Sequence, residues 1–116
     1  MKYKIKKSEA ITTQENGISR FHEYQFPFQN ASLGVSEING RYPESGFDID
    51  TEVEASWYVE EGNANIWIGG KIYQVEKGDM VYVPKNEKYW IDGKNLKLVV
   101  ASSPVWHPDQ HSHIEE

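Results

Sequence analysis

The stretch from residue 52 to residue 59, EVEASWYV, alternates without exception between an apolar set and a second, mostly polar set. Successive side chains of a β-strand point to opposite faces, so this period of two indicates a strand that is buried on one face only. Ala55 and Trp57 are predicted to point inward, whereas Glu54 is predicted to point outward. The segment therefore predicts a sheet with one face turned to a core.

Turn signals separate further short apolar runs along the chain. Gly69-Gly70 is predicted to form a hairpin apex, and Gly78-Asp79 is predicted to open the next strand. Asn39-Gly40 and Asp92-Gly93 predict two further tight turns. The C-terminal stretch HPDQHSHIEE, with Pro108 near its start, is the only segment that favours a helix. The pattern predicts an all-β sandwich or barrel with a short C-terminal helix.

Length and charge exclude several classes of protein. A chain of 116 residues with 38% hydrophobic residues is large enough for a single core and too short for two. The formal net charge of −6 argues against nucleic acid as a partner, because such binding depends on clustered Lys and Arg. The short basic run MKYKIKK at residues 1–7 is predicted to be a solvated terminal strand.

Cysteine is absent from the chain, which excludes disulfides and thiolate catalysis. No apolar run is long enough for a secretory signal or a membrane span, so no membrane partner is expected. The absence of cysteine fits a reducing compartment, and together with the absence of a secretory signal it leads us to predict a cytoplasmic protein.

The order of features in residues 58–90, YVEEGNANIWIGGKIYQVEKGDMVYVPKNEKYW, resembles the core of the cupin superfamily. A Tyr-Val-x-x-Gly strand end comes first, followed by a glycine-turned hairpin, a Gly-Asp strand start and a proline. The resemblance covers residues from about 18 to 111. It implies a double-stranded β-helix, or jelly-roll barrel, as one domain over residues 1–116, with its barrel core at about 18–104 and a tail at 105–116.

In cupins, two sequence motifs bring three histidines and a glutamate to a divalent transition metal inside the barrel. The second motif fits here through Gly78 and Pro84, and it places Tyr89 at the position of the histidine. The first motif places Asp48 and Asp50 at its two histidine positions. The resemblance thus implies a metal pocket whose histidines are all replaced.

The position of the motif's glutamate has two solutions. A three-residue spacer selects Glu54, and a four-residue spacer selects Ala55. Strand alternation points Ala55 inward and Glu54 outward, which favours Ala55. The resemblance then implies Asp48, Asp50, Ala55 and Tyr89 in place of the usual ligands.

Two interpretations of this altered set remain open. Asp48, Asp50 and Tyr89 could form an oxygen-only site for a hard cation. Alternatively, the pocket has lost its metal and either binds a molecule or merely packs. We favour the second interpretation, because tyrosine is a poor ligand unless it loses a proton with a pKa of about 10. No cofactor is therefore predicted.

Histidine is concentrated in the tail, where His107, His111 and His113 lie close together. On a helix, His107 and His111 would share one face and could hold a metal, although such tails are commonly solvated. His22 falls on an early strand, where a surface or hydrogen-bonded role is expected.

A jelly-roll barrel leaves a cavity at its mouth, where aromatic rings and scattered polar groups would suit a sugar, a nucleotide-sugar or an aromatic acid. Trp57 is also a candidate core ring, and Tyr89 is the candidate catalytic residue. The predicted ligand-binding residues are Trp57, Tyr73, Arg41, Asp50, Trp90 and Trp106.

Four functions fit these residues. We predict a metal-free small-molecule-binding cupin that acts as a sensor or accessory protein. The alternatives are a metal-free isomerase, epimerase or lyase in which Tyr89 or a histidine moves a proton, a metal-dependent dioxygenase or isomerase with atypical ligands, and a domain that mainly dimerises. A homodimer is predicted from the family resemblance, and because an uncovered sheet edge invites a second chain.

Overall fold

A computed structural model describes residues 3–28 and 30–116 of the chain. Nearly every regular element in these residues is a strand, so the all-β prediction is confirmed. The elements are the 3-10 helix η1 (Lys7–Glu9), strands β1 (Ile11–Glu15), β2 (Ser19–Tyr24), β3 (Ser32–Tyr42), β4 (Phe47–Asp50), β5 (Glu54–Ile68), β6 (Lys71–Glu76), β7 (Met80–Val83) and β8 (Tyr89–Ser103), the 3-10 helix η2 (Pro108–Gln110) and strand β9 (His111–Ile114).

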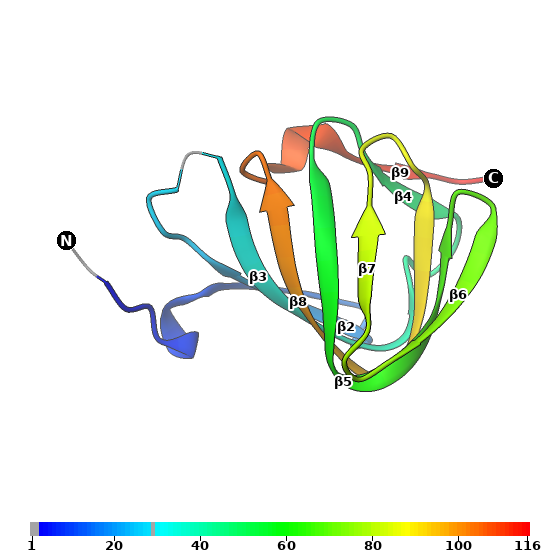
Figure 1. Cartoon of the computed structure of the whole chain (residues 1–116), viewed down its shortest axis with the longest axis horizontal. Coiled ribbons are helices and arrows are strands. Elements are labelled where there is room, and N and C mark those ends of the chain that lie inside the picture. The colour runs from blue at the N-terminus through cyan, green and yellow to red at the C-terminus, as the bar shows by residue number, and fades with distance from the viewer. Residues whose placement is uncertain (1–2, 29) are drawn as a thin grey trace.

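The two long strands β5 and β8 form the centre of a curled sheet. They pair antiparallel over most of their length, with Glu54 opposite Ser103 and Ile68 opposite Tyr89. β3, β2 and β1 extend the sheet from β8, whereas β6 and β7 both pair with β5. The sheet bends into a half-barrel (Figure 1), as expected of long strands with the usual right-handed twist.

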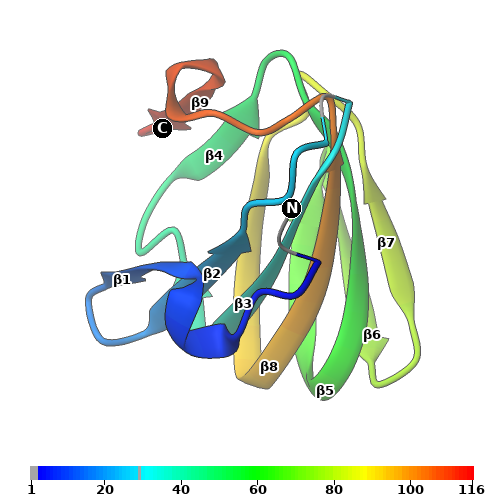
Figure 2. The same ribbon diagram turned by 90° about the vertical axis from the view of Figure 1, so that its left-hand side faces the viewer.

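β4 and β9 form a two-stranded ribbon that lies across one end of the half-barrel (Figure 1). β4 pairs with β8 where Asp48 is opposite Tyr89, and it also pairs with β9. Figure 2 shows the ribbon set apart from the sheet of β3, β8 and β5. This arrangement brings residues 47–50 beside the C-terminal tail, which we define as residues 105–116.

The inner face of the half-barrel is apolar and holds the core. Burial confirms the predicted inward face of the central segment, because Val53, Trp57 and Val59 expose 2%, 6% and 0% of their surface. Ala55 packs partly buried against the same core, and Glu54 is exposed. The other buried members of the core are Ile38, Ala64, Ile66, Val75, Val81, Val83, Tyr89, Ile91, Leu96 and Leu98.

Two of the predicted turns are wrong. Asn39-Gly40 lies inside β3 and Asp92-Gly93 lies inside β8, where Gly40 pairs with Gly93. A Cβ added to Gly93 would come within 2.7 Å of the carbonyl oxygen of Ile38, so this glycine permits a close backbone approach and not a turn. The hairpin at Gly69-Gly70 is confirmed, and both of its glycines have positive φ.

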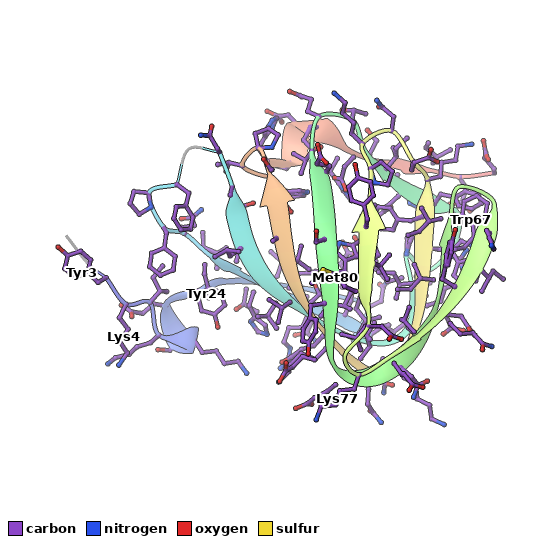
Figure 3. All side chains as sticks on the ribbon, viewed as in Figure 1. Tyr3, Lys4, Tyr24, Trp67, Lys77 and Met80 are labelled. Atoms are coloured by element: carbon purple, nitrogen blue, oxygen red, sulfur yellow. The ribbon has the colours of Figure 1, made fainter. Side chains whose placement is uncertain are left out.

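The predicted N-terminal strand is wrong over residues 3–7, where the only regular element begins at Lys7. Met1 and Lys2 lie outside the described residues. Tyr3 is 83% exposed and lies at the end of the molecule opposite Trp67 (Figure 3). The segment therefore lacks the burial of one face that would hold a strand in place.

The predicted C-terminal helix is wrong beyond its first turn. η2 spans only Pro108–Gln110, and the next residues form β9 on β4. Strand pairing prevails because it sets His111 opposite Asp50 and His113 opposite Asp48. In the part of the chain that the structure describes, no helix is long and apolar enough to cross a membrane.

Candidate functional site

A cluster of polar side chains joins the β4–β9 ribbon to the inner face of the half-barrel. Directly opposed residues of a strand pair share one face, so the side chains of Asp48, Asp50, His111 and His113 all lie on the same side of the ribbon. Hydrogen bonds connect them to side chains from β3, β8 and the tail. We call the whole set the aspartate cluster: Tyr42, Asp48, Asp50, Tyr89, Trp106, Gln110, His111 and His113.

His111 bridges the two aspartates. Its Nδ1 lies 2.9 Å from Asp50 Oδ1, and its Nε2 lies 3.0 Å from Asp48 Oδ2. An ionised carboxylate only accepts hydrogen bonds, so both contacts are satisfied when both ring nitrogens carry a proton. Burial lowers the pKa of His111, but hydrogen bonds to the two aspartates and their charges outweigh burial and raise the pKa to about 9. His111 is therefore a cation at neutral pH.

The Asp50 carboxylate is held by donors from the tail and from β8. Its Oδ1 accepts hydrogen bonds from Trp106 Nε1 at 3.2 Å and from Gln110 Nε2 at 2.8 Å, in addition to the one from His111. The Tyr89 hydroxyl lies 3.5 Å from Oδ2, which makes this contact weak. The tail donors thus fix the direction of the Asp50 side chain.

Asp48 is the more deeply buried of the two aspartates, with 3% of its surface exposed. Its Oδ1 accepts a hydrogen bond from His113 Nδ1 at 2.9 Å. The Asp48 carboxylate also accepts a hydrogen bond from the hydroxyl of Tyr42, which was not among the predicted site residues. Burial alone would raise the pKa of Asp48, but the hydrogen bonds from His111, His113 and Tyr42 hold it below its usual value. Asp48 is therefore an anion at neutral pH.

Tyr89, the predicted catalytic residue, is a ring of the core. It is 5% exposed, and it stands edge-to-face with Trp57 at a centroid distance of 5.0 Å. Burial, followed by the charge of Asp50, raises the pKa of Tyr89 well above its usual value. The hydroxyl therefore stays protonated and can donate a hydrogen bond, but it is poorly suited to act as a base. The catalytic role of Tyr89 stays a prediction.

The aspartate cluster does not fit the transition metal of the cupin motifs. Both carboxylates face the N–H groups of His111, which is a cation, and Ala55 offers no ligand atom. A protonated tyrosine is a poor ligand in addition. Within residues 3–28 and 30–116, no group of three or more His, Cys, Asp or Glu side chains is arranged to hold a metal ion. That the protein works without a cofactor stays a prediction.

The predicted ligand-binding residues divide between the two faces of the sheet. Asp50 and Trp106 belong to the aspartate cluster, and Trp57 packs against Tyr89 of the same cluster. Trp90 points to the outer face, because its neighbour Tyr89 points inward and side chains alternate along a strand. The structure therefore brings only part of the predicted set together.

Arg41 and Tyr73 make local contacts. The Arg41 guanidinium lies 5.0 Å from the centre of the Trp90 ring and donates hydrogen bonds to two carbonyl oxygens of the loop between β3 and β4. Tyr73 lies on β6, where it is 44% exposed and the Lys71 ammonium is 5.5 Å from its ring centre. These contacts fix a loop and cover an edge strand, and among the described residues neither side chain hydrogen-bonds to the aspartate cluster.

Sequence reasoning missed Gln110 and placed the tail histidines on a helix. The two-residue spacing of the aspartates and of the histidines is the signal that could have predicted the pairing of β4 with β9. Asp48 and Asp50 are two residues apart, as are His111 and His113, and in a strand this spacing puts both side chains on one face. The single four-residue spacing of His107 and His111, which suits a helix, was weaker evidence than these two matching two-residue spacings, which suit a strand.

Two surface hollows lie away from the aspartate cluster. One of about 350 Å³ is lined by residues from β2, β3 and β8, including Arg20, Glu37 and Lys97. A second, of about 720 Å³, is lined by residues from β5, β6 and β8, including Asn65 and Gln74. No residue of the aspartate cluster lines either hollow, so neither gives access to it.

A family model described as the cupin domain matches residues 44–101 of the chain. This match includes β4, β5 and most of β8, the strands that position the aspartates and Tyr89. No curated protein matches the sequence.

Solved structures with the same architecture differ strongly in sequence. A variant of Streptomyces Pac13 with uridine has a TM-score of 0.88 at 16% identity, over 99% of this chain and 92% of that chain, and Pac13 is described as a nucleoside dehydratase. An RmlC-like cupin from Shewanella frigidimarina NCIMB 400 has a TM-score of 0.74 at 15% identity, over 94% of this chain and 96% of that chain. KdgF from Halomonas sp. has a TM-score of 0.71 at 11% identity, over 88% of this chain and 94% of that chain. These likenesses confirm the predicted jelly-roll barrel fold.

Proposed function

The chain belongs to the cupin domain family, and we propose that it binds a small organic molecule at the aspartate cluster without the family's usual metal. A carbohydrate-like molecule, such as a sugar or the ribose of a nucleoside, suits the cluster best. The observation that carries this proposal is the position of two carboxylates, the buried and ionised Asp48 and the partly buried Asp50, beside the ring pair of Trp57 and Tyr89. Carboxylates accept hydrogen bonds from hydroxyl groups, which a sugar or a ribose carries in number.

A solved complex of a structural relative supports this ligand class. The Pac13 variant was determined with uridine, a nucleoside that carries ribose hydroxyls. At 16% identity the likeness itself concerns the fold, so uridine serves here as a first probe. Aromatic acids remain the second ligand class that the sequence favours.

Calorimetric titration of the full chain tests the proposal. We expect uridine or ribose to bind, and we expect Asp50→Asn to weaken that binding at least about tenfold, because an amide oxygen is a poorer acceptor than a carboxylate. Asp92→Asn is the matched control, since Asp92 is exposed on β8 opposite Arg41. Equal affinities of the wild type and Asp50→Asn, or the absence of binding for both probes, would contradict the proposal.

A metal-free lyase or isomerase is the second candidate function. His111, a cation between two carboxylates, sets a proton donor beside two acceptors, which is the arrangement that general acid–base catalysis needs. Product analysis after incubation with the same probes separates this candidate from simple binding. Turnover that is lost in Tyr89→Phe while binding is retained would support the predicted catalytic role of Tyr89.

We also propose that the protein is a homodimer that pairs through the outer face of the sheet. Met80 and Val99 are both opposite Tyr58 on the neighbouring strands, so these three side chains share the outer face, where Met80 and Val99 are 65% and 40% exposed. Contiguous exposed apolar side chains favour an interface. Light scattering after size exclusion is expected to give twice the chain mass of 13.4 kDa. A mass of one chain at micromolar concentration would contradict the dimer.

A further inference from the structure

The groups that would bind a ligand at the aspartate cluster are covered. Tyr89 and Asp48 expose 5% and 3% of their surface, the Asp50 side chain exposes 13%, and the two hollows between β2, β3 and β8 and between β5, β6 and β8 are lined by other residues. If the proposed function is right, a ligand can reach the two carboxylates only after some covering segment moves. The segment that moves is the one whose attachment is weakest.

The C-terminal tail covers the cluster and is attached mainly through polar contacts. β9 pairs with β4 and, in the described chain, with no other strand. Gln110 is buried, but no residue from 111 to 116 is. Beyond the cluster and the β4–β9 ladder, polar contacts join Lys88 to Glu116, Ser45 to Glu115, Thr51 and Glu52 to Gln110, Glu52 to His107, and Ser32 to the backbone of Trp106. A strand held in this way opens more easily than the apolar strands β5 and β8.

Lifting the tail removes donors from both aspartates. Asp50 would lose the N–H groups of Trp106, Gln110 and His111, and Asp48 would lose those of His111 and His113. Each carboxylate would then keep only a tyrosine hydroxyl as donor, Tyr42 for Asp48 and Tyr89 for Asp50, which is unfavourable for a buried charge. A molecule that takes the place of the tail must therefore bring hydrogen-bond donors of its own. It must also avoid negative charge, because the His111 cation leaves together with the tail.

We propose that the ligand displaces the C-terminal tail and takes over the hydrogen bonds that the tail makes with Asp48 and Asp50, and that it is a neutral molecule rich in hydroxyl groups. This inference rests on the proposed function and narrows it, because it excludes the aromatic acids that the sequence also favours. The tail and the ligand then compete for the same two carboxylates, and Asp48 and Asp50 select ligands that are neutral and rich in hydroxyl groups.

Hydrogen exchange of the full chain, with uridine as the probe, tests the displacement. We expect saturating uridine to speed exchange of the amides of residues 111–114 at least about tenfold, while the amides of β5 and β8 keep their rates. Uridine-5′-carboxylate, the matched anionic probe, is expected to bind at least about tenfold more weakly than uridine.

His111→Asn tests the competition. Asparagine has no positive charge and cannot bridge both aspartates. We therefore expect the hydrogen-exchange rates of the amides of residues 111–114 in the free protein to rise about tenfold, and we expect uridine to bind several-fold more tightly. Ser112→Ala is the control, because Ser112 is exposed, lies opposite Ile49 and points away from the cluster. It should leave both quantities unchanged.

The outcomes separate this inference from the proposed function. Uridine that binds while residues 111–114 stay protected, or a carboxylate analogue that binds as tightly as uridine, overturns the displacement and leaves the proposed function standing. Uridine that binds neither the wild type nor His111→Asn overturns both. Unchanged tail exchange in His111→Asn shows that His111 does not hold the tail, and it overturns the inference whatever the probe does.

Discussion

Replacing Asp48 with asparagine is expected to lower the free energy of unfolding by about 3–5 kcal/mol at pH 7, the usual cost of removing one partner of a buried ion pair. Asp48 is 3% exposed and accepts hydrogen bonds from His111, His113 and Tyr42. Asparagine keeps the size of the side chain, but it removes the charge that balances His111. Its amide group would also face N–H donors where an acceptor is needed. Urea unfolding at constant temperature measures the change.

The pH dependence of stability gives the same variant a second readout. His111 has a folded-state pKa of about 9, above its ordinary value of 6.5, so its contribution is fully present below 6.5 and is lost as the pH rises through 9. That contribution is on the order of 3 kcal/mol. Asp48 has a lowered pKa, so its contribution is present above its ordinary value of 3.8 and is lost as the pH falls through the lower folded-state pKa. Asp48→Asn should flatten the fall in stability between pH 6.5 and 9.

Asp92→Asn controls for the loss of one negative charge, because Asp92 is exposed and lies outside the aspartate cluster. It should change the free energy of unfolding by less than about 0.5 kcal/mol. A cost below about 1 kcal/mol for Asp48→Asn, together with an unchanged slope above pH 6.5, would show that the bridge contributes little to the folded state.

Patterns confined to one strand predicted the fold well. The alternation of residues 52–59 gave the buried face of β5, and the pair Gly69-Gly70 gave the β5–β6 hairpin. The same type of signal failed at Asn39-Gly40 and Asp92-Gly93, because Gly40 and Gly93 face each other inside the sheet. Whether a glycine makes a turn or admits a close neighbour depends on long-range pairing, which a local motif does not contain.

The site was predictable only on its barrel side. The order of the cupin motifs brought Asp48, Asp50 and Tyr89 together, and the structure joins Asp48 to Tyr89 across β4 and β8. The partners of the aspartates come from the tail, about 60 residues away in sequence, and their approach depends on the register of β9 on β4. No local propensity fixes that register, so the histidines could not be assigned to the aspartates in advance.

Side-chain parity would have improved the predicted ligand-binding set. Tyr89 and Trp90 are neighbours on β8, so they point to opposite faces and cannot both line one pocket. Arg41 stacks on Trp90 and therefore goes with it to the outer face. The family resemblance indicated a pocket inside the barrel, whereas the alternation of side chains along each strand decides which residues can line that pocket.

Replacing Trp57 with alanine is expected to lower the free energy of unfolding by about 3–5 kcal/mol, as is typical when a large ring is removed from a core. Trp57 is 6% exposed, and its ring stands edge-to-face with Tyr89. In the sheet it is flanked by Val81 on β7 and Val100 on β8, so the neighbours that would have to close the cavity are fixed by strand pairing. Guanidinium unfolding of the purified variant measures the loss.

A cycle of variants separates packing from ligand binding at this ring. Ile72→Ala is the control for a large apolar side chain on the outer face, where 53% exposure predicts a change below about 0.5 kcal/mol. Combining Trp57→Ala with Tyr89→Ala should recover about 0.5–1.5 kcal/mol relative to the sum of the single changes, because the two rings pack on each other. A stable Trp57→Ala protein that has lost only its affinity for uridine would contradict the core role. Trp57 would then be a ligand contact, as the sequence alone predicts, and the inner face would have to open further than displacement of the tail requires.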